Sequence, residues 1–116
     1  MLIPRWTDLE VISKFAQYEY KHGAIERGRT IFENILSTYP KRLDLWSVYI
    51  DMEVVAQAFD KARSVFERVA TLNLSSKKMR FIFKKWLQFE KEHGTVKQQE
   101  HVKQRATEYV ESRSQK

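Results

Sequence analysis

A pattern of bulky residues followed by a glutamate occurs three times along this chain and constrains its fold more than any other feature. The copies are separated by steps of 34 and 37 residues, and they are Ile12, Phe15, Tyr18, Glu19; Trp46, Tyr49, Met52, Glu53; and Phe83, Trp86, Phe89, Glu90. A second motif keeps the same phase, because Arg29-Thr-Ile-Phe-Glu33 recurs 34 residues later as Arg63-Ser-Val-Phe-Glu67. A fixed period in this range, with two helical patterns in each unit, is typical of a helical-hairpin solenoid.

Each repeat is predicted to form two helices joined by a short turn. Apolar residues at helical spacing predict helices that begin near residues 7, 25, 42, 59, 75 and 95. The sequences Thr-x-x-Glu at 7–10 and Thr-x-x-Gln at 95–98 are expected to cap the first and sixth helices. Gly23 and Gly94 are expected to end the first and fifth helices, because glycine readily adopts the left-handed conformation found there. The turn between the third and fourth helices has no glycine.

We therefore predict an all-α fold, a right-handed helical-hairpin solenoid of three repeats in a single domain. The repeats are expected at about residues 7–40, 41–74 and 75–112. The sixth helix has polar residues where the earlier units carry their Arg-x-Ile/Val-Phe-Glu cluster, as a terminal capping helix requires. Because the repeat is under way almost from the first residue, we expect the chain to be the carboxy-terminal part of a longer protein. In isolation, the apolar outer face of the first repeat is expected to form a dimer.

Composition and charge narrow the range of functions. The 116 residues include no cysteine, which excludes disulfides and thiolate metal sites, and no apolar run of the roughly 20 residues that a membrane span needs. The net charge of +6 is unevenly placed, since residues 1–74 carry 10 basic and 10 acidic side chains, whereas residues 75–116 carry 11 basic and 5 acidic ones. An excess of cations at one end indicates an acidic partner or a nucleic acid.

The fifth predicted helix carries much of this excess. Six cations lie along this helix. Four are at helical spacing on one face, namely Lys77, Arg80, Lys84 and Lys91, and two lie beside them, namely Lys78 and Lys85. The aromatic residues Phe83, Trp86 and Phe89 lie opposite, so the helix is amphipathic. Three interpretations of the cations remain open: a solvated helix face, a contact with an acidic protein, and a contact with an RNA backbone. The sequence contains no aromatic signature of an RNA-recognition domain.

The polar and titratable residues at repeat positions are expected to be structural. Glu19, Glu53 and Glu90 belong to successive layers instead of converging in a cleft, so we expect them to pair with backbone groups or with Arg29 and Arg63. The sequence therefore predicts no catalytic residue and no enzyme.

Histidines and tryptophans are interpreted in the same way. His22 and His93 precede helix-ending glycines, where a positive imidazole is favourable, and His101 is expected to be solvated. Trp46 and Trp86 occupy apolar repeat positions and are expected to pack in the core instead of stacking on bases. We expect no metal ion and no cofactor.

The repeat pattern resembles the half-a-TPR (HAT) repeat. Trp46-x-x-Tyr49-x-x-x-Glu53, followed by Ala62-Arg63-Ser-Val-Phe-Glu-Arg68, is close to the HAT pattern. The resemblance assigns a structural role in the repeat to Ile12, Phe15, Glu19, Arg29, Phe32, Trp46, Tyr49, Glu53, Arg63, Phe66, Phe83, Trp86 and Glu90. It also implies membership of an RNA-processing assembly, since HAT repeats occur almost wholly in such proteins.

A narrower resemblance covers residues 9–112. Segments such as Leu36-Ser-Thr-Tyr-Pro-Lys-Arg42, Leu45-Trp-Ser-Val-Tyr-Ile-Asp-Met52 and Gln88-Phe-Glu-Lys-Glu-His-Gly94 are similar to the carboxy-terminal HAT region of the ribosomal RNA-processing protein 5 family, also called programmed cell death protein 11. This resemblance implies a protein-interaction scaffold of the nucleolus, within the nucleus, that acts in pre-rRNA processing and small-subunit assembly. The implied partners are ribosome assembly factors in a pre-ribosomal particle, and pre-rRNA or small nucleolar RNA bound directly or through the parent protein.

Two other functions are compatible with the sequence. One is a HAT scaffold of a pre-mRNA splicing or 3′-end cleavage complex, which the identity of co-purifying RNA would distinguish. The other is a direct RNA-binding module that uses the basic face of the fifth helix, for which binding must depend strongly on salt.

Overall fold

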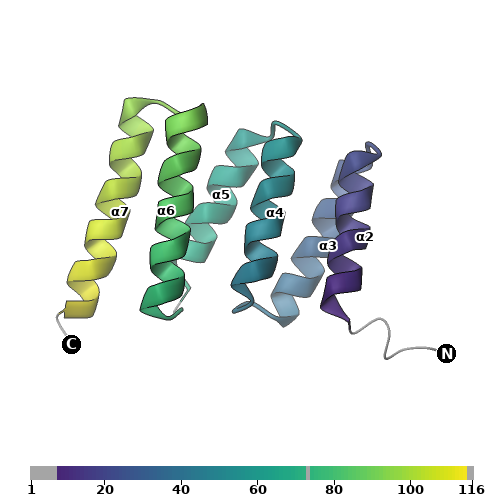
Figure 1. Ribbon diagram of the computed structural model, residues 1–116, viewed down its shortest axis with the longest axis horizontal. Coiled ribbons are helices and arrows are strands. Elements are labelled where there is room, and N and C mark those ends of the chain that lie inside the picture. Colours follow the sequence, from purple (N-terminus) through teal and green to yellow (C-terminus); the bar gives the residue numbers. More distant parts are fainter. Residues whose placement is uncertain (1–7, 73, 115–116) are drawn as a thin grey trace. The chain divides into compact units, whose positions relative to one another are not determined.

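The structure of the chain is a computed structural model that describes residues 8–72 and 74–114. Every regular element in these residues is an α-helix (Figure 1). The helices are α2 (Leu9–Lys21), α3 (Ile25–Thr38), α4 (Leu43–Val55), α5 (Phe59–Ala70), α6 (Ser76–His93) and α7 (Val96–Ser114). They pack as hairpins in the manner of three HAT repeats, which confirms the all-α prediction.

Side-chain caps fix the starts of α2, α6 and α7, although the first cap differs from the expectation. The Asp8 carboxylate accepts hydrogen bonds from the backbone N–H groups of Glu10 (3.1 Å) and Val11 (3.5 Å). The expected cap, Thr7, lies outside the described residues. Aspartate at this position satisfies free amides and also interacts favourably with the positive end of the helix dipole.

The capping box predicted for the last helix is confirmed. The backbone N–H of Gln98 donates to the Thr95 hydroxyl at 3.2 Å, and the backbone N–H of Thr95 donates to Oε1 of Gln98 at 2.9 Å. At the start of α6, the Ser75 hydroxyl accepts from the backbone N–H of Lys78 at 3.3 Å.

The turns within the first two hairpins share one backbone conformation although their sequences differ. Gly23 has a φ of 86°, and Gln57, which lies 34 residues later, adopts a φ of 59°. In both turns the N–H of the next residue, an alanine, donates to the carbonyl of the repeat glutamate, at 2.8 and 2.9 Å. The missing glycine therefore leaves the turn intact, at the cost of a left-handed glutamine.

The third turn departs from the expectation of a left-handed glycine. Gly94 has a φ of −115° and is extended. A Cβ at this position would meet the ends of the Glu90 and Gln98 side chains, which would have to shift to make room for it.

The described residues divide into two compact units, one up to residue 65 and one from residue 66 on, so that α5 contributes to both. In the first unit, Phe32 is fully buried and stacks on Tyr49 with ring centroids 5.1 Å apart. Trp46 is also buried, and its indole N–H donates to the carbonyl of Pro40 at 2.7 Å. The start of α4 is thereby attached to the loop before it.

The core of the second unit is built around a tryptophan. Phe66 stacks on Trp86 with centroids 5.5 Å apart and planes 4° from parallel. Met79, Ile82 and Val102 are also buried in this unit. Of these five residues, only Val102 comes from α7, so the last helix contributes less to the core than α6 does.

Helix α2 buries a different stripe from the one that its aromatic residues predict. Phe15 and Tyr18 are 51% and 57% exposed, and Ile12 is half-buried. The corresponding Tyr49 packs against Phe32 of the preceding hairpin. The described residues include no hairpin ahead of α2, which leaves its aromatic positions uncovered.

Helix α6 is longer than the first helices of the other hairpins. It has 18 residues, against 13 in α2 and in α4. Seven residues of α6 precede Phe83 in the helix, whereas only three residues of α4 precede the corresponding Trp46. The step of 37 residues therefore arises from added helix at the start of α6. No helix in the described part of the chain is both long and apolar enough to span a membrane.

Candidate functional site

The most deeply buried charge in the first unit is structural. Glu53 has no exposed surface, and both of its carboxylate oxygens accept hydrogen bonds from Arg29, from Nε at 2.7 Å and from Nη2 at 2.9 Å. The Tyr20 hydroxyl donates to the same carboxylate at 3.0 Å. Each donor comes from the preceding hairpin, so this cluster joins α4 to both α2 and α3.

The electrostatics of this cluster keep Tyr20 and Arg29 in fixed protonation states. Burial, and secondarily the negative charge of Glu53, raises the pKa of the Tyr20 hydroxyl well above its ordinary value. The hydrogen bond to Glu53 raises the pKa of Arg29. Tyr20 therefore stays neutral and Arg29 stays charged at physiological pH, which suits a fixed structural link better than proton transfer.

The other two repeat glutamates are also buried. Glu19 is 7% exposed and pairs with Arg27 at 3.3 Å, and Glu90 is 2% exposed. In residues 8–72 and 74–114 no group of three histidines, cysteines or carboxylates is arranged to hold a metal ion.

The histidines lie near helix ends or on α7. His22 is the C-cap of α2, and His93 is the last residue of α6. His101 is exposed, as expected, and it also has a partner, because its Nε2 lies 2.6 Å from a carboxylate oxygen of Glu67. Arg105 Nε donates to the same carboxylate at 3.0 Å, so two side chains of α7 bind the motif glutamate of α5.

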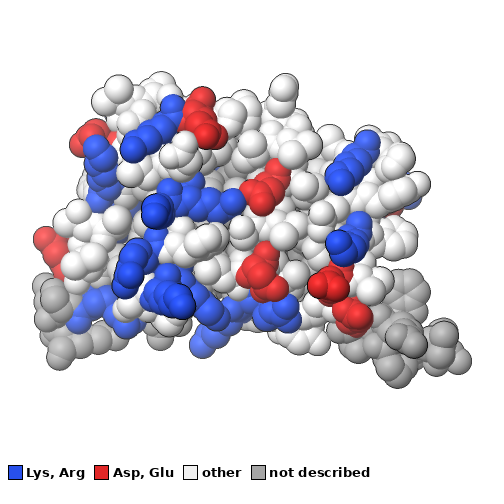
Figure 2. All heavy atoms as spheres, in the orientation of Figure 1, with Lys and Arg blue, Asp and Glu red and all other residues white. Residues whose placement is uncertain are grey.

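The six predicted cations of α6 differ in exposure. Lys77, Lys78, Arg80, Lys84 and Lys91 are exposed, whereas Lys85 is half-buried and has a polar partner. Over α6 and α7, Lys and Arg side chains predominate on the face that Figure 2 shows. Two members of the set, Arg80 and Lys84, line a hollow that the sequence did not predict.

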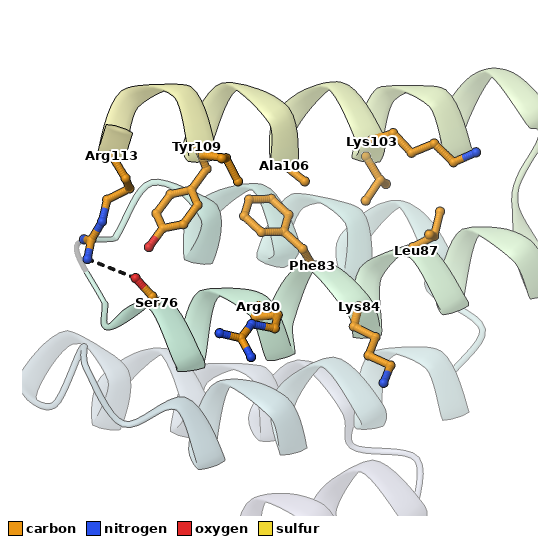
Figure 3. Close-up of a pocket in the computed structure, with 11 residues that line it drawn as sticks. Ser76, Arg80, Phe83, Lys84, Leu87, Lys103, Ala106, Tyr109 and Arg113 are labelled. Atoms are coloured by element: carbon orange, nitrogen blue, oxygen red, sulfur yellow. Dashed lines mark hydrogen bonds between the residues drawn. The ribbon is translucent and has the colours of Figure 1, made fainter. Parts of the chain in front are cut away.

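This hollow is a groove of about 680 Å³ between α6 and α7 (Figure 3). Its lining residues are Ser76, Arg80, Phe83, Lys84 and Leu87 of α6, and Val102, Lys103, Ala106, Tyr109, Val110 and Arg113 of α7. Figure 3 shows Phe83, Ala106 and Tyr109 directed into the space between the two helices. The lining therefore consists of an apolar floor with polar and cationic residues around it.

One end of the groove is closed by Arg113. Its Nη2 donates to the Ser76 hydroxyl at 3.0 Å, and its guanidinium lies 5.6 Å from the centroid of the Tyr109 ring. The Tyr109 hydroxyl and the Trp86 indole N–H are buried with no hydrogen-bond partner among the described residues.

The family-level comparison covers almost the whole chain. A family model described as the PRP39 N-terminal HAT repeat matches residues 9–113. The chain belongs to the HAT repeat family. This family model is named after one HAT protein, PRP39. The match therefore establishes the class of repeat and not the pathway in which the chain acts.

Several individual proteins that this chain resembles share the name RRP5. The chain is 51% identical over 112 residues to "Protein RRP5 homolog" of Mus musculus, 53% identical over 108 residues to "rRNA biogenesis protein rrp5" of Schizosaccharomyces pombe, and 48% identical over 112 residues to "rRNA biogenesis protein RRP5" of Arabidopsis thaliana. The alignments cover 97%, 93% and 97% of this chain and 6% of each relative. The chain thus spans about 6% of the length of these relatives.

These matches confirm the resemblance of these HAT repeats to a HAT region of RRP5. The place of that region within RRP5 stays a prediction. The groove was missed for a different reason: helical spacing predicts that Ala106, Tyr109 and Val110 are apolar positions of the last helix, but does not show that they are incompletely buried. The small side chain of Ala106 opposite Phe83 was the available signal.

Proposed function

We propose that this HAT region is a protein-interaction scaffold that acts in pre-rRNA processing and small-subunit assembly in the nucleolus. The observation that carries the proposal is an identity near 50%, over almost the whole chain, to proteins named for rRNA biogenesis. Its partners are assembly factors of a pre-ribosomal particle.

Two features of the residues support binding instead of catalysis. The buried carboxylate of Glu53 is occupied by Arg29 and Tyr20, and so has no free acid or base function. Solenoids of short repeats present extended surfaces, which suit the binding of other macromolecules.

Affinity capture from nuclear extract tests this proposal. The 116-residue chain serves as bait, with and without RNase treatment, and both proteins and RNA are identified. We expect small-subunit assembly factors to remain bound after RNase, together with pre-rRNA or small nucleolar RNA before it. Recovery of splicing or 3′-end cleavage factors would instead assign the chain to the alternative HAT assemblies.

The exposed cations of α6 support a second candidate function, direct binding of RNA. Lys77 and Lys78 lie on the first turn of α6 and outside the groove, where they are accessible to a phosphate backbone. Titration of a labelled pre-rRNA fragment at two salt concentrations tests this function. Each neutralised phosphate contributes about 0.7 to the log–log slope for single strands and about 0.9 for duplexes.

A matched pair of variants makes this test specific. Lys77→Gln with Lys78→Gln should weaken binding and reduce the salt slope, whereas Lys14→Gln with Lys21→Gln, which removes two exposed cations of α2, should change neither. An absence of binding at low salt would refute the RNA-binding function.

A further inference from the structure

The groove between α6 and α7 has a floor built to contact apolar groups. Phe83 and Leu87 of α6 face Ala106 and Tyr109 of α7 across it. A larger residue at position 106 would fill the space opposite Phe83, so the alanine leaves the hollow open. Val110, which also lines the groove, is 61% exposed. A concave site with an apolar lining and a few polar groups around it is the usual form of a binding site.

The charges around the floor all have one sign. The groove is lined by Arg80, Lys84, Lys103 and Arg113, and no carboxylate is among the lining residues. Arg80 and Lys84, one helical turn apart, have no carboxylate within ion-pair distance in the described part of the chain. Lys103 pairs with Glu100 of its own helix, at 3.4 Å. A partner with carboxylates at its edges would be electrostatically complementary to this rim.

The length of the groove selects the form of the partner. From Ser76 to Leu87 it follows eleven residue steps of α6, or about 16 Å at 1.5 Å per residue. A partner helix makes about three turns in that distance, which places apolar residues at positions i, i+3 or i+4, and i+7 along the floor. The groove runs between α6 and α7, so the axis of a partner helix would be aligned with them, and Arg113 closes one end through its hydrogen bond to Ser76.

We propose that this groove binds an acidic amphipathic helix of a ribosome assembly protein, an inference that rests on the proposed scaffold function. The apolar floor favours this partner over RNA, because the phosphates of RNA would contact only the cations of the rim. The rim also disfavours a second copy of the same groove, because two such surfaces would bring four cations against four. The acidic helix satisfies both the floor and the rim.

The binding test uses peptides of defined sequence. Segments of 16 residues that tile the known ribosome assembly proteins are displayed and selected against the 116-residue chain, and the selected peptides are titrated by fluorescence anisotropy. We expect them to be acidic, with apolar residues at three- and four-residue spacing. Selection of peptides without this pattern, or of none, would overturn the proposal.

Two exposed valines of α7 provide a matched pair of variants. Val110→Glu places a carboxylate in the groove, and Val96→Glu makes the same change at a residue that is 72% exposed and outside the groove. We expect Val110→Glu to weaken peptide binding at least about tenfold, because an unpaired charge is then desolvated at the interface. Val96→Glu should leave the affinity unchanged. Far-UV circular dichroism checks that both variants fold, and equal affinities would overturn the proposal.

A second pair of variants separates the rim from the general charge of α6. Arg80→Glu with Lys84→Glu should weaken binding of the acidic peptides more than Lys77→Glu with Lys78→Glu, which makes the same change of net charge on the same helix. Equal losses of affinity would show that the overall positive charge attracts the peptides. They would refute a specific role for the cations at the rim of the groove.

Affinity capture with the Val110→Glu bait separates this inference from the scaffold function. If the variant retains every assembly factor that the unaltered chain captures, the groove proposal fails and the scaffold function stands. If the unaltered chain captures no assembly factor, the scaffold function itself fails. Concentration-dependent dimerisation that Val110→Glu abolishes would assign the groove to a second copy and overturn the proposal.

Discussion

Glu53 occupies an environment in which a carboxylate is stable only while its donors are present. Its side chain has no contact with solvent, and its two oxygens receive three hydrogen bonds from Arg29 and Tyr20. Removing the charge partner of a buried ion leaves that ion desolvated and unpaired, which costs more than the pair itself contributes.

We therefore expect Arg29→Gln to lower the free energy of unfolding by about 3–5 kcal/mol. Urea denaturation followed by circular dichroism measures the change. Arg27→Gln is the control, since the Arg27 side chain is 73% exposed and its pair with Glu19 should contribute at most about 1 kcal/mol. Similar losses in the two variants would contradict the structural role of the Glu53 cluster.

Gln57 is a second residue whose conformation limits stability. Its φ of 59° is one that side chains other than glycine adopt at a cost of about 1–2 kcal/mol. Gln57→Gly should raise the free energy of unfolding by up to about 1 kcal/mol, because relief of this strain exceeds the added entropy of the unfolded chain.

The control at this position is Gln57→Ala, which removes the same side-chain polar group but keeps a Cβ. It should not stabilise the chain. A glycine variant no more stable than the alanine variant, in the same denaturation assay, would show that the turn is not strained.

At the scale of the elements, α4 is fixed at its beginning by one side chain. Trp46 is 3% exposed, and its hydrogen bond to the Pro40 carbonyl attaches the helix to the loop that precedes it. The same helix is held further along by Tyr49, whose hydroxyl donates to Glu33 of α3 at 2.6 Å.

Trp46→Ala should cost about 3–5 kcal/mol, as truncations of buried aromatic residues do. Trp46→Phe keeps most of the apolar volume and loses the hydrogen bond to Pro40, so its cost should be distinctly smaller. Thermal unfolding monitored at 222 nm compares the variants. An alanine variant that melts with the unaltered chain would refute the burial of this residue.

The sequence predicted helices better than the surfaces between them. The 3.6-residue periodicity and the Thr95/Gln98 capping box are local signals, and they placed α7 within about two residues of its observed ends. The groove depends on the size of Ala106 relative to Phe83 on another helix. Periodicity marks both residues as apolar and contains no information about the space left between them.

The exposed aromatic face of α2 illustrates the same limit. Phe15 and Tyr49 occupy equivalent positions in the sequence repeat, yet one is 51% exposed and the other 3%. A repeat position specifies which neighbour a side chain would contact, and burial also requires that the neighbour be present. The equivalence of sequence positions therefore predicted the helix and not the environment.

At the scale of the whole molecule, the apolar face of α2 and the cations of the last hairpin are two distinct surfaces for association. Val11, Phe15 and Tyr18 are each more than half exposed on α2. Exposed apolar surface of this kind favours self-association when no partner covers it.

We expect the isolated chain to dimerise through this face as its concentration rises, and Phe15→Ser to keep it monomeric. Sedimentation velocity over a range of concentrations measures the association. Phe81→Ser is the control, because Phe81 of α6 is similarly exposed at 48% and lies outside the groove. A chain that stays monomeric at every concentration would contradict this prediction.

The link between Glu53 and the preceding hairpin has a consequence for biosynthesis. Arg29 and Tyr20 leave the ribosome before Glu53 does, so the groups that neutralise the carboxylate are already available when α4 emerges. During synthesis from the N-terminus, the nascent chain therefore never has to bury the Glu53 carboxylate before its partners are present. A chain shortened to begin at residue 41 would lack both groups, and we would expect it to aggregate or be degraded instead of folding around a stranded charge.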